Sequence, residues 1–262
     1  MNFKNIILEK TEVVARITLN RPEVLNAISP DLLSEMETAF ADIEKDETIR
    51  AVVIAAKGRA FCAGADLKAL KGIISSPVKY EEFVRLFHRT ANAIEQSTKP
   101  VICTVQGMAL AGGLELVNAC DIVIASEEAK LGDQHANFGL IPGGGNSQRL
   151  PRIVGARKAK EILLTGEWLS AAEAERIGLV NKVVPADKLE EAVNEMVDKI
   201  TKNKSPAAAK RLKSLVNDGM QVDLRSGLEL EIQATCNYFK FYDPQEGIKA
   251  FEEKRTPVFK GM

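Results

Sequence analysis

The sequence predicts an α/β fold with a helical C-terminal region. In the first two-thirds of the chain, short apolar runs rich in β-branched residues alternate with segments whose apolar residues recur at helical spacing. Strands that alternate with helices in this way form parallel sheets through right-handed crossovers. From residue 189 onward nearly every segment is helical, so we divide the 262-residue chain into a core of residues 1–200 and a helical region of residues 201–262.

Five segments of the core are predicted to be strands. Residues 13–19 alternate apolar and polar side chains, which is typical of a half-buried strand. Three continuously apolar runs indicate strands that are covered on both faces, and these are residues 51–55, 100–105 and 121–125. A last short strand is expected over residues 181–184, and the polar segment 1–12 carries no strand prediction.

The predicted helices follow from apolar periodicity and from their start signals. Ser29 and Pro30 open a helix that runs to Glu44, with proline in its first turn, and residues 80–97 are amphipathic. The remaining predicted helices span residues 171–177, 189–200, 206–218, 224–241 and 244–253. The helical tail is too short for a comfortable core of its own, so we expect it to pack on the core or on a neighbouring subunit.

Composition narrows the classes of function. The 35 Lys and Arg against 36 Asp and Glu leave a formal net charge of -1, which gives no global attraction to nucleic acid or acidic membranes. With two histidines, and four cysteines that lack CxxC spacing, a His-rich metal site or a zinc ribbon is not expected. The polar N-terminus does not look like a secretory signal, and no apolar run is long enough to span a bilayer. We therefore expect a cytoplasmic protein with buried free thiols.

Three glycine-bearing segments are the candidate sites, because chemistry often requires unusual backbone. They read AFCAGADL (residues 60–67), GMALAGGLEL (107–116) and LGDQHANFGLIPGGGNSQRL (131–150). A glycine pair before a helix is often only a tight turn, and the PGGG run lacks the Lys-Ser/Thr of a P-loop, which argues against nucleotide binding. Two such loops nevertheless place backbone N–H groups near helix starts, where a pair of donors can hold an oxyanion.

Glu115 stands out among these residues. It lies in the apolar stretch ALAGGLELVNA, near the start of a predicted helix, where a carboxylate can simply complement the helix dipole. Its neighbours are small and apolar, however. Burial among them would raise the pKa of Glu115 toward the range that suits general acid–base catalysis.

The chain resembles the crotonase (enoyl-CoA hydratase/isomerase) superfamily. Motifs in the family's order run along nearly the whole chain, among them LNRPEVLNAI (residues 19–28), AFCAGADLKAL (60–70), GMALAGGLELVNACDIVIA (107–125) and GLIPGGGNSQRL (139–150). The resemblance implies repeated ββα turns that form a spiral, and a C-terminal helical region that builds trimers, often paired into hexamers. It also implies acyl-CoA substrates, with coenzyme A as part of the substrate and no further cofactor or metal.

The resemblance assigns roles to individual positions. The backbone N–H groups of Ala65 and Gly112 would hold the thioester oxygen while an enolate forms, and Glu115 matches the first of two family glutamates. Two positions match family contacts to coenzyme A, namely Leu25 and Lys68. By a looser analogy, Lys254 or Lys260 would add a charge near the phosphates of coenzyme A.

One position departs from the family pattern. His135 stands 20 residues after Glu115, where typical hydratases carry the second glutamate. The two side chains can still share the acid and base roles of hydration, because imidazole has a suitable pKa near neutrality. Asp133 could orient His135, but alternation along an extended loop is expected to point these two side chains apart. His88 is expected to lie on a helix surface.

The leading hypothesis is an acyl-CoA lyase that reversibly hydrates an enoyl-CoA or dienoyl-CoA. An enoyl-CoA isomerase would move a proton between carbons with one group, which the family usually places at the position of His135. A C–C bond hydrolase of a β-ketoacyl-CoA or diketone would pair this histidine with an aspartate, but Gly144 stands at that position.

A non-enzymatic acyl-CoA or RNA binder on the same fold is the remaining alternative. The basic cluster that would favour RNA lies within residues 202–213 and is expected to form a solvated helix face, so no nucleic-acid or membrane partner is expected. Residues 72–84 are expected to line or cover the acyl end of the substrate, and such segments vary freely.

Overall fold

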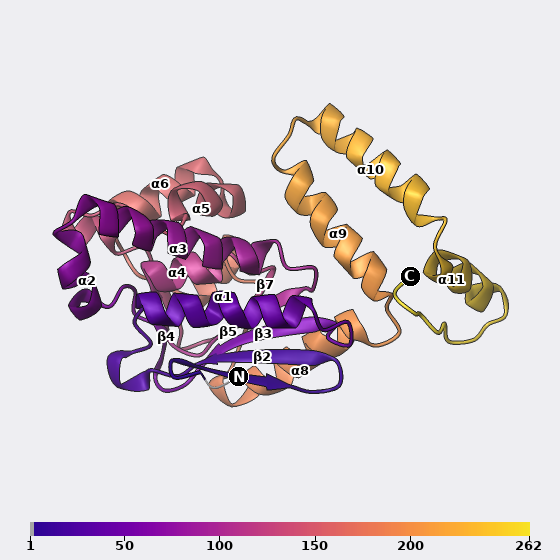
Figure 1. Cartoon of the computed structure of the whole chain (residues 1–262), viewed down its shortest axis with the longest axis horizontal. Helices are drawn as coiled ribbons and strands as arrows, with labels where there is room; N and C mark the ends of the chain where they lie inside the picture. The colour runs from indigo at the N-terminus through magenta and orange to yellow at the C-terminus, as the bar shows by residue number, and fades with distance from the viewer. Residues whose placement is uncertain (1–2) are drawn as a thin grey trace.

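Two sheets organise the core of the protein, of which a computed structural model describes residues 3–262 (Figure 1). The larger sheet has six strands in the order β1 (Ile6–Lys10), β2 (Val14–Leu19), β3 (Ala51–Ala56), β5 (Val101–Val105), β7 (Ile122–Ser126) and β10 (Lys182–Val184). The smaller sheet has four short strands in the order β4 (Ala60–Cys62), β6 (Met108–Leu110), β8 (Lys130–Gly132) and β9 (Leu169–Ser170). Neighbouring strands are parallel except in the pairs β1–β2 and β8–β9.

The larger sheet contains every strand that the sequence predicts, and one that it does not. β1 comes from the polar N-terminal segment and forms an antiparallel hairpin with β2, in which Ile6 pairs with Leu19. Ile6 is the one fully buried residue of β1, whereas Glu9 and Lys10 are exposed at its end. An edge strand with so little buried surface has no clear hydrophobic pattern, so periodicity in the sequence did not predict this strand.

The smaller sheet repeats the course of the larger one. β4, β6 and β8 each follow a strand of the larger sheet after a short turn, and each has three residues. The chain then passes through a helical segment before it returns to the larger sheet. This strand–strand–helix repeat is the arrangement that the resemblance implies. Strands of three residues are too short to show a period of two, so only the resemblance predicts them.

Helices cover both faces of the larger sheet. Val53 and Ile102 point to one face and pack with Val193, while Val52 and Ile54 belong to the main core on the other face. This double coverage explains the continuously apolar runs of the central strands. The helices of the core are α1 (Pro30–Glu44), α2 (Leu67–Ile74), α3 (Pro77–Glu95), α4 (Gly112–Val117), α5 (Asn146–Val154), α6 (Ala156–Thr165), α7 (Ala171–Arg176) and α8 (Leu189–Thr201).

The last three helices stand away from the two sheets (Figure 1). They are α9 (Pro206–Gly219), α10 (Leu224–Tyr238) and α11 (Tyr242–Glu252). Neither α9 nor α10 contains a buried residue. Their exposed apolar side chains include Leu212, Val216, Leu224, Leu228 and Ile232. The tail therefore has little core of its own, in agreement with the length argument, and it leaves an apolar surface open in the single chain.

Lys213 on α9 corrects the prediction of a wholly solvated basic face. Its side chain is 8% exposed, and its Nζ donates to Asp121 Oδ2 at 2.7 Å. The same Nζ donates to the carbonyl oxygens of Ile94 and Lys99, at 3.2 Å each. Burial is tolerated because an opposite charge and two carbonyls satisfy the ammonium group. Lys213 therefore ties α9 to the core.

The structure shows where the four thiols lie and how apolar the helices are. All four cysteines are free thiols, and Cys62 and Cys103 are buried. Cys236 is exposed on α10, so the expectation of a buried thiol is wrong for this residue in the single chain. Among residues 3–262, no helix combines the length and the apolarity needed to cross a membrane.

Candidate active site

Glu115 is a buried carboxylate at the first turn of α4. Its residue is 1% exposed, and its Oε1 accepts hydrogen bonds from the N–H groups of Gly144 at 2.6 Å and Asn146 at 3.2 Å. Burial raises the pKa of Glu115 above 4.5, although the charge of His135 and the two N–H donors oppose the rise. The predicted acid–base group thus has the buried environment that its apolar neighbours indicated, with Oε1 held by two backbone donors.

The two predicted oxyanion donors lie close together. Gly64 adopts a φ of +105°, and a Cβ placed on it would lie 3.7 Å from the backbone nitrogen of Gly112, which brings the loop of Ala65 against the start of α4. Within residues 3–262, neither the Ala65 N–H nor the Gly112 N–H donates a hydrogen bond. Ala111, directly before Gly112, has a φ of 49°, a conformation that non-glycine residues rarely adopt and that is concentrated at functional sites.

His135 begins a short 3-10 helix, His135–Phe138, and contacts Asp133. Its Nδ1 lies 2.8 Å from Asp133 Oδ1, and its backbone N–H donates to the same oxygen at 3.1 Å. The expectation that these two side chains point apart is therefore wrong. Residues two positions apart share one face of an extended segment, so alternation did not support that expectation. The chain also turns at Gln134 after β8, and the Asp133 carboxylate accepts from the backbone N–H two residues on, which brings the two side chains together.

Two buried asparagines extend this contact. Asn146 Nδ2 donates to Asp133 Oδ2 at 2.8 Å, and Asn118 Nδ2 donates to Asn146 Oδ1 at 2.7 Å. Because the Asn146 N–H also binds Glu115, one hydrogen-bonded chain joins the two candidate acid–base groups. Sequence reasoning did not single out Asn118 or Asn146; their one sequence signal was a polar amide in an otherwise glycine-rich or apolar stretch.

The surroundings of Asp133 and His135 favour the charged form of each side chain. Burial alone would raise the pKa of Asp133, but hydrogen bonds from His135 and Asn146 outweigh it and hold the pKa below its ordinary value. Burial alone would lower the pKa of His135, but the hydrogen bond and charge of Asp133, together with the charge of Glu115, raise it above 6.5. Within residues 3–262, no three or more His, Cys, Asp or Glu side chains gather in a way that could hold a metal ion.

The structure brings two of the three predicted coenzyme A residues to the oxyanion loop. The Ala63 N–H donates to the Leu25 carbonyl at 3.0 Å, and the Lys68 N–H donates to Asp66 Oδ1 at 3.1 Å, so both residues flank Ala65. Lys254 follows α11, at the opposite end of the molecule from α2 (Figure 1). Within one chain, Lys254 therefore lies far from this loop.

Phe87 is a further residue of the site that sequence reasoning treated only as part of a helix face. It is buried on α3, and its ring would lie 3.3 Å from a Cβ at Gly112 and 2.6 Å from a Cβ at Gly144. Phe87 therefore packs against both Gly112 and Gly144 and forms one wall of the site. The segment 72–84, expected at the acyl end, consists largely of the end of α2 and the start of α3.

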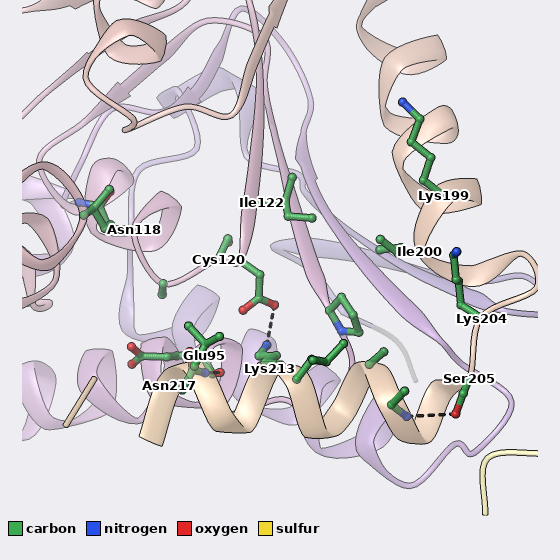
Figure 2. A pocket seen from close by; sticks show the side chains of 18 residues that line it. Glu95, Asn118, Cys120, Ile122, Lys199, Ile200, Lys204, Ser205, Lys213 and Asn217 are labelled. Atoms are coloured by element: carbon green, nitrogen blue, oxygen red, sulfur yellow. Dashed lines mark hydrogen bonds and ion pairs between the residues drawn. The ribbon is translucent and has the colours of Figure 1, made fainter. Parts of the chain in front are cut away.

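A cavity of about 660 Å³ lies elsewhere, between α9, the C-terminal end of α4 and the start of β7 (Figure 2). The Lys213–Asp121 ion pair crosses it, and Lys199, Lys204 and Asn217 also line it. Glu115, His135, Ala65 and Gly112 do not line this cavity. This cavity therefore lies between α9 and the core, apart from the candidate catalytic groups.

The sequence motifs and this geometry agree with the comparison to known proteins. The family model "Enoyl-CoA hydratase/isomerase" matches residues 9–262. The chain belongs to the enoyl-CoA hydratase/isomerase family. A short-chain-enoyl-CoA hydratase of Clostridium acetobutylicum is 40% identical over 97% of each chain. A crotonyl-CoA hydratase of Syntrophomonas wolfei is 39% identical over 99% of each chain.

The solved structures of the enoyl-CoA hydratase/isomerase family confirm the fold. The crystal structure of an enoyl-CoA hydratase from Bacillus anthracis superposes with a TM-score of 0.94 at 41% identity, and covers 99% of this chain and 100% of that one. The crotonase-type fold implied by the resemblance is therefore correct, including the helical C-terminal region.

Proposed function

We propose that this protein catalyses the reversible addition of water to the α,β double bond of an enoyl-CoA or dienoyl-CoA thioester. One observation carries the proposal. A buried carboxylate, Glu115, and an imidazole, His135, are joined by hydrogen bonds next to a loop pair whose Ala65 and Gly112 N–H groups donate to nothing else within residues 3–262. Such a set can activate water, deliver a proton and hold an enolate oxygen.

The reaction balances with these groups alone. Glu115 accepts a proton from water as the water oxygen bonds to Cβ. The electrons of the double bond move toward the thioester, whose oxygen becomes an enolate held by the N–H groups of Ala65 and Gly112. The His135 imidazolium then donates its proton to Cα, and exchange with solvent returns the proton from Glu115 to His135 before the next turnover. Dehydration reverses each step. A single oxyanion donor typically contributes about 2.7–4 kcal/mol to lowering the barrier.

The opposite charges of Glu115 and His135 indicate which group is the base and which is the acid. Burial raises the pKa of Glu115, and the hydrogen bond and charge of Asp133 raise that of His135 despite its burial, so we propose that the carboxylate and the imidazolium coexist in the free enzyme. The opposite charges favour this state, because each stabilises the ionised form of the other. We therefore assign the role of base to Glu115 and that of acid to His135.

The alternative reactions find less support. A C–C hydrolase would need an aspartate at position 144, but a Cβ there would lie 2.6 Å from the Phe87 ring and 2.8 Å from Glu115 Oε2. An isomerase needs one proton-carrying group, whereas two are connected here. The hydratase names of relatives at 39–40% identity over almost the whole chain also favour hydration over a silent binder.

We also propose how substrate and subunits are arranged. Leu25 and Lys68 flank the oxyanion loop and would contact coenzyme A. Lys254 lies far from this loop within one chain, so it would add charge only if the C-terminal end of a neighbouring subunit reached the site. The open apolar faces of α9 and α10 favour self-association into trimers or hexamers, and the free thiols favour a cytoplasmic location. Sedimentation of the purified protein tests the assembly, and a monomer would contradict it.

The decisive test of the reaction is product analysis in deuterated water. The protein is incubated with a panel of enoyl-, dienoyl- and β-ketoacyl-CoAs, and the masses of the products are measured by mass spectrometry. Hydration adds water and a Cα deuteron while the carbon skeleton stays intact. Deuterium exchange without added water would indicate an isomerase, a new carboxylate from a broken C–C bond would indicate a hydrolase, and no turnover would indicate a binder.

A further inference from the structure

We propose that Asp133 and Asn146 are positioning residues that orient the imidazole of His135 for proton transfer through Nε2. The inference rests on the proposed hydration and goes beyond it, because neither residue touches the substrate in that mechanism. The candidate pair Glu115 and His135 explains which groups move protons. Asp133 and Asn146 explain how an imidazole can take the place of a family glutamate.

The contacts of Asp133 define the tautomer of His135. As a carboxylate, Asp133 only accepts hydrogen bonds, so the His135 Nδ1 at 2.8 Å must carry a proton. The backbone N–H of His135 binds the same oxygen, which fixes both the ring and its attachment point. Nε2 has no partner within residues 3–262 and is left as the nitrogen that exchanges a proton.

Asn146 fixes Asp133 in turn. Its Nδ2 donates to the second carboxylate oxygen of Asp133, while its Oδ1 accepts from Asn118. Because Asn118 Nδ2 donates to Asn146 Oδ1, the Nδ2 group of Asn146 points toward Asp133. Asn118 therefore fixes the orientation of the Asn146 amide. Asp133 and Asn146 are both fully buried, which keeps water from replacing these bonds.

Asn146 also connects the two proton-transfer groups. Its backbone N–H donates to Glu115 Oε1, and its side chain holds Asp133. The start of α5 therefore fixes the base and the acid relative to each other through a single residue. A misplaced Asn146 would disturb both groups together.

The charged groups that face His135 are Asp133, from the loop after β8, and Glu115, from α4. Both are acidic, so each favours the imidazolium. Removal of Asp133 would leave a mostly buried ring with one carboxylate neighbour, and its tendency to hold a proton would fall.

The first experiment titrates His135 in the protein by ¹⁵N NMR, with crotonyl-CoA turnover by the same sample measured beforehand. The His88→Gln variant leaves one histidine signal and is a suitable host, because His88 is exposed on α3. We expect a pKa above 6.5 and, in the neutral form, a proton on Nδ1. A pKa at or below 6.5, or a neutral form protonated on Nε2, would overturn the proposal. Absent turnover would instead overturn the proposed function, since the titration does not depend on it.

The second experiment measures Asp133→Asn in the native background and in the His135→Ala background. If Asp133 acts through His135, the substitution lowers kcat by roughly 10²-fold in the native background, with a smaller change in KM, and by nothing further without the imidazole. It also lowers the pKa of His135. Equal losses in both backgrounds would show a merely structural role. If Asp133→Asn does not fold, the titration of the histidine in the intact chain decides alone.

Discussion

The Oε1 atom of Glu115 accepts a hydrogen bond from the Gly144 N–H at 2.6 Å, and this contact makes Gly144 part of the wall of the site. A Cβ at this position would lie 2.8 Å from the other carboxylate oxygen of Glu115 and 2.6 Å from the Phe87 ring. The glycine is required for close approach, because either neighbour would have to shift to admit even a methyl group.

The substitution Gly144→Ala is therefore expected to impair both stability and activity. Overpacking against Phe87 should lower the free energy of unfolding by about 1–3 kcal/mol, and the displaced carboxylate should slow hydration. Urea denaturation and initial rates measure the two effects. The matched control is Gly143→Ala, whose Cβ would meet Val84 at an ordinary 3.5 Å. Equal behaviour of the two variants would contradict the close approach at Gly144.

Replacement of Glu115 by glutamine should separate activity from stability. The rate should fall by at least about 10²-fold, the low end of the contribution of general acid–base catalysis. Because burial raises the pKa of Glu115 above its unfolded value, ionisation destabilises the fold as pH rises through that interval, so the neutral amide should be at least as stable at pH 7. Steady-state rates and thermal unfolding check both statements. A large loss of stability would mean that the carboxylate is structural.

The role of His135 has its own test. His135→Ala should lose activity because it removes the proposed donor of the Cα proton, whereas His88→Gln should keep it, since His88 is exposed on α3. Initial rates of the two purified variants give the comparison. Full activity of His135→Ala would remove this residue from the mechanism.

The pH dependence of kcat/KM for hydration is expected to be bell-shaped. Activity should rise with pH as Glu115 loses its proton, at an apparent pKa above 4.5, and fall as the imidazolium loses its proton, at an apparent pKa above 6.5. The two values belong to the interacting pair. The variant His135→Gln should lose the alkaline limb. An unchanged limb in that variant would assign it to another group.

The Lys213–Asp121 contact predicts a stability effect far from the site. In Lys213→Met, Asp121 keeps the Val101 N–H as a donor at 2.7 Å but loses its ammonium partner. Burial already raises the pKa of Asp121, so the loss should cost about 1–3 kcal/mol of unfolding free energy. Chemical denaturation provides the measurement, with exposed Lys210→Met as the control. A cost no larger than that of the control would show that the ion pair contributes nothing.

Local patterns predicted most of the secondary structure. The Ser29 hydroxyl accepts from the Leu32 N–H at the start of α1, as the Ser-Pro signal indicated, and the apolar runs became the central strands. These features depend on neighbours within a few positions. The edge strand β1 and the three-residue strands of the smaller sheet depend on pairing with distant segments, so periodicity could not reveal them.

The sequence likewise predicted some features of the candidate site and not others. Glu115, the two glycine loops and His135 were recognisable from residue type, spacing and family motifs. The contact between Asp133 and His135, the asparagine pair that anchors it, the Phe87 wall and the ion pair of Lys213 were not. The first and the last of these opposed the expectation. Residue order specifies which side chains are available and which segments are apolar. Whether two side chains meet depends on turn geometry and on packing between distant elements, and only the folded chain sets these.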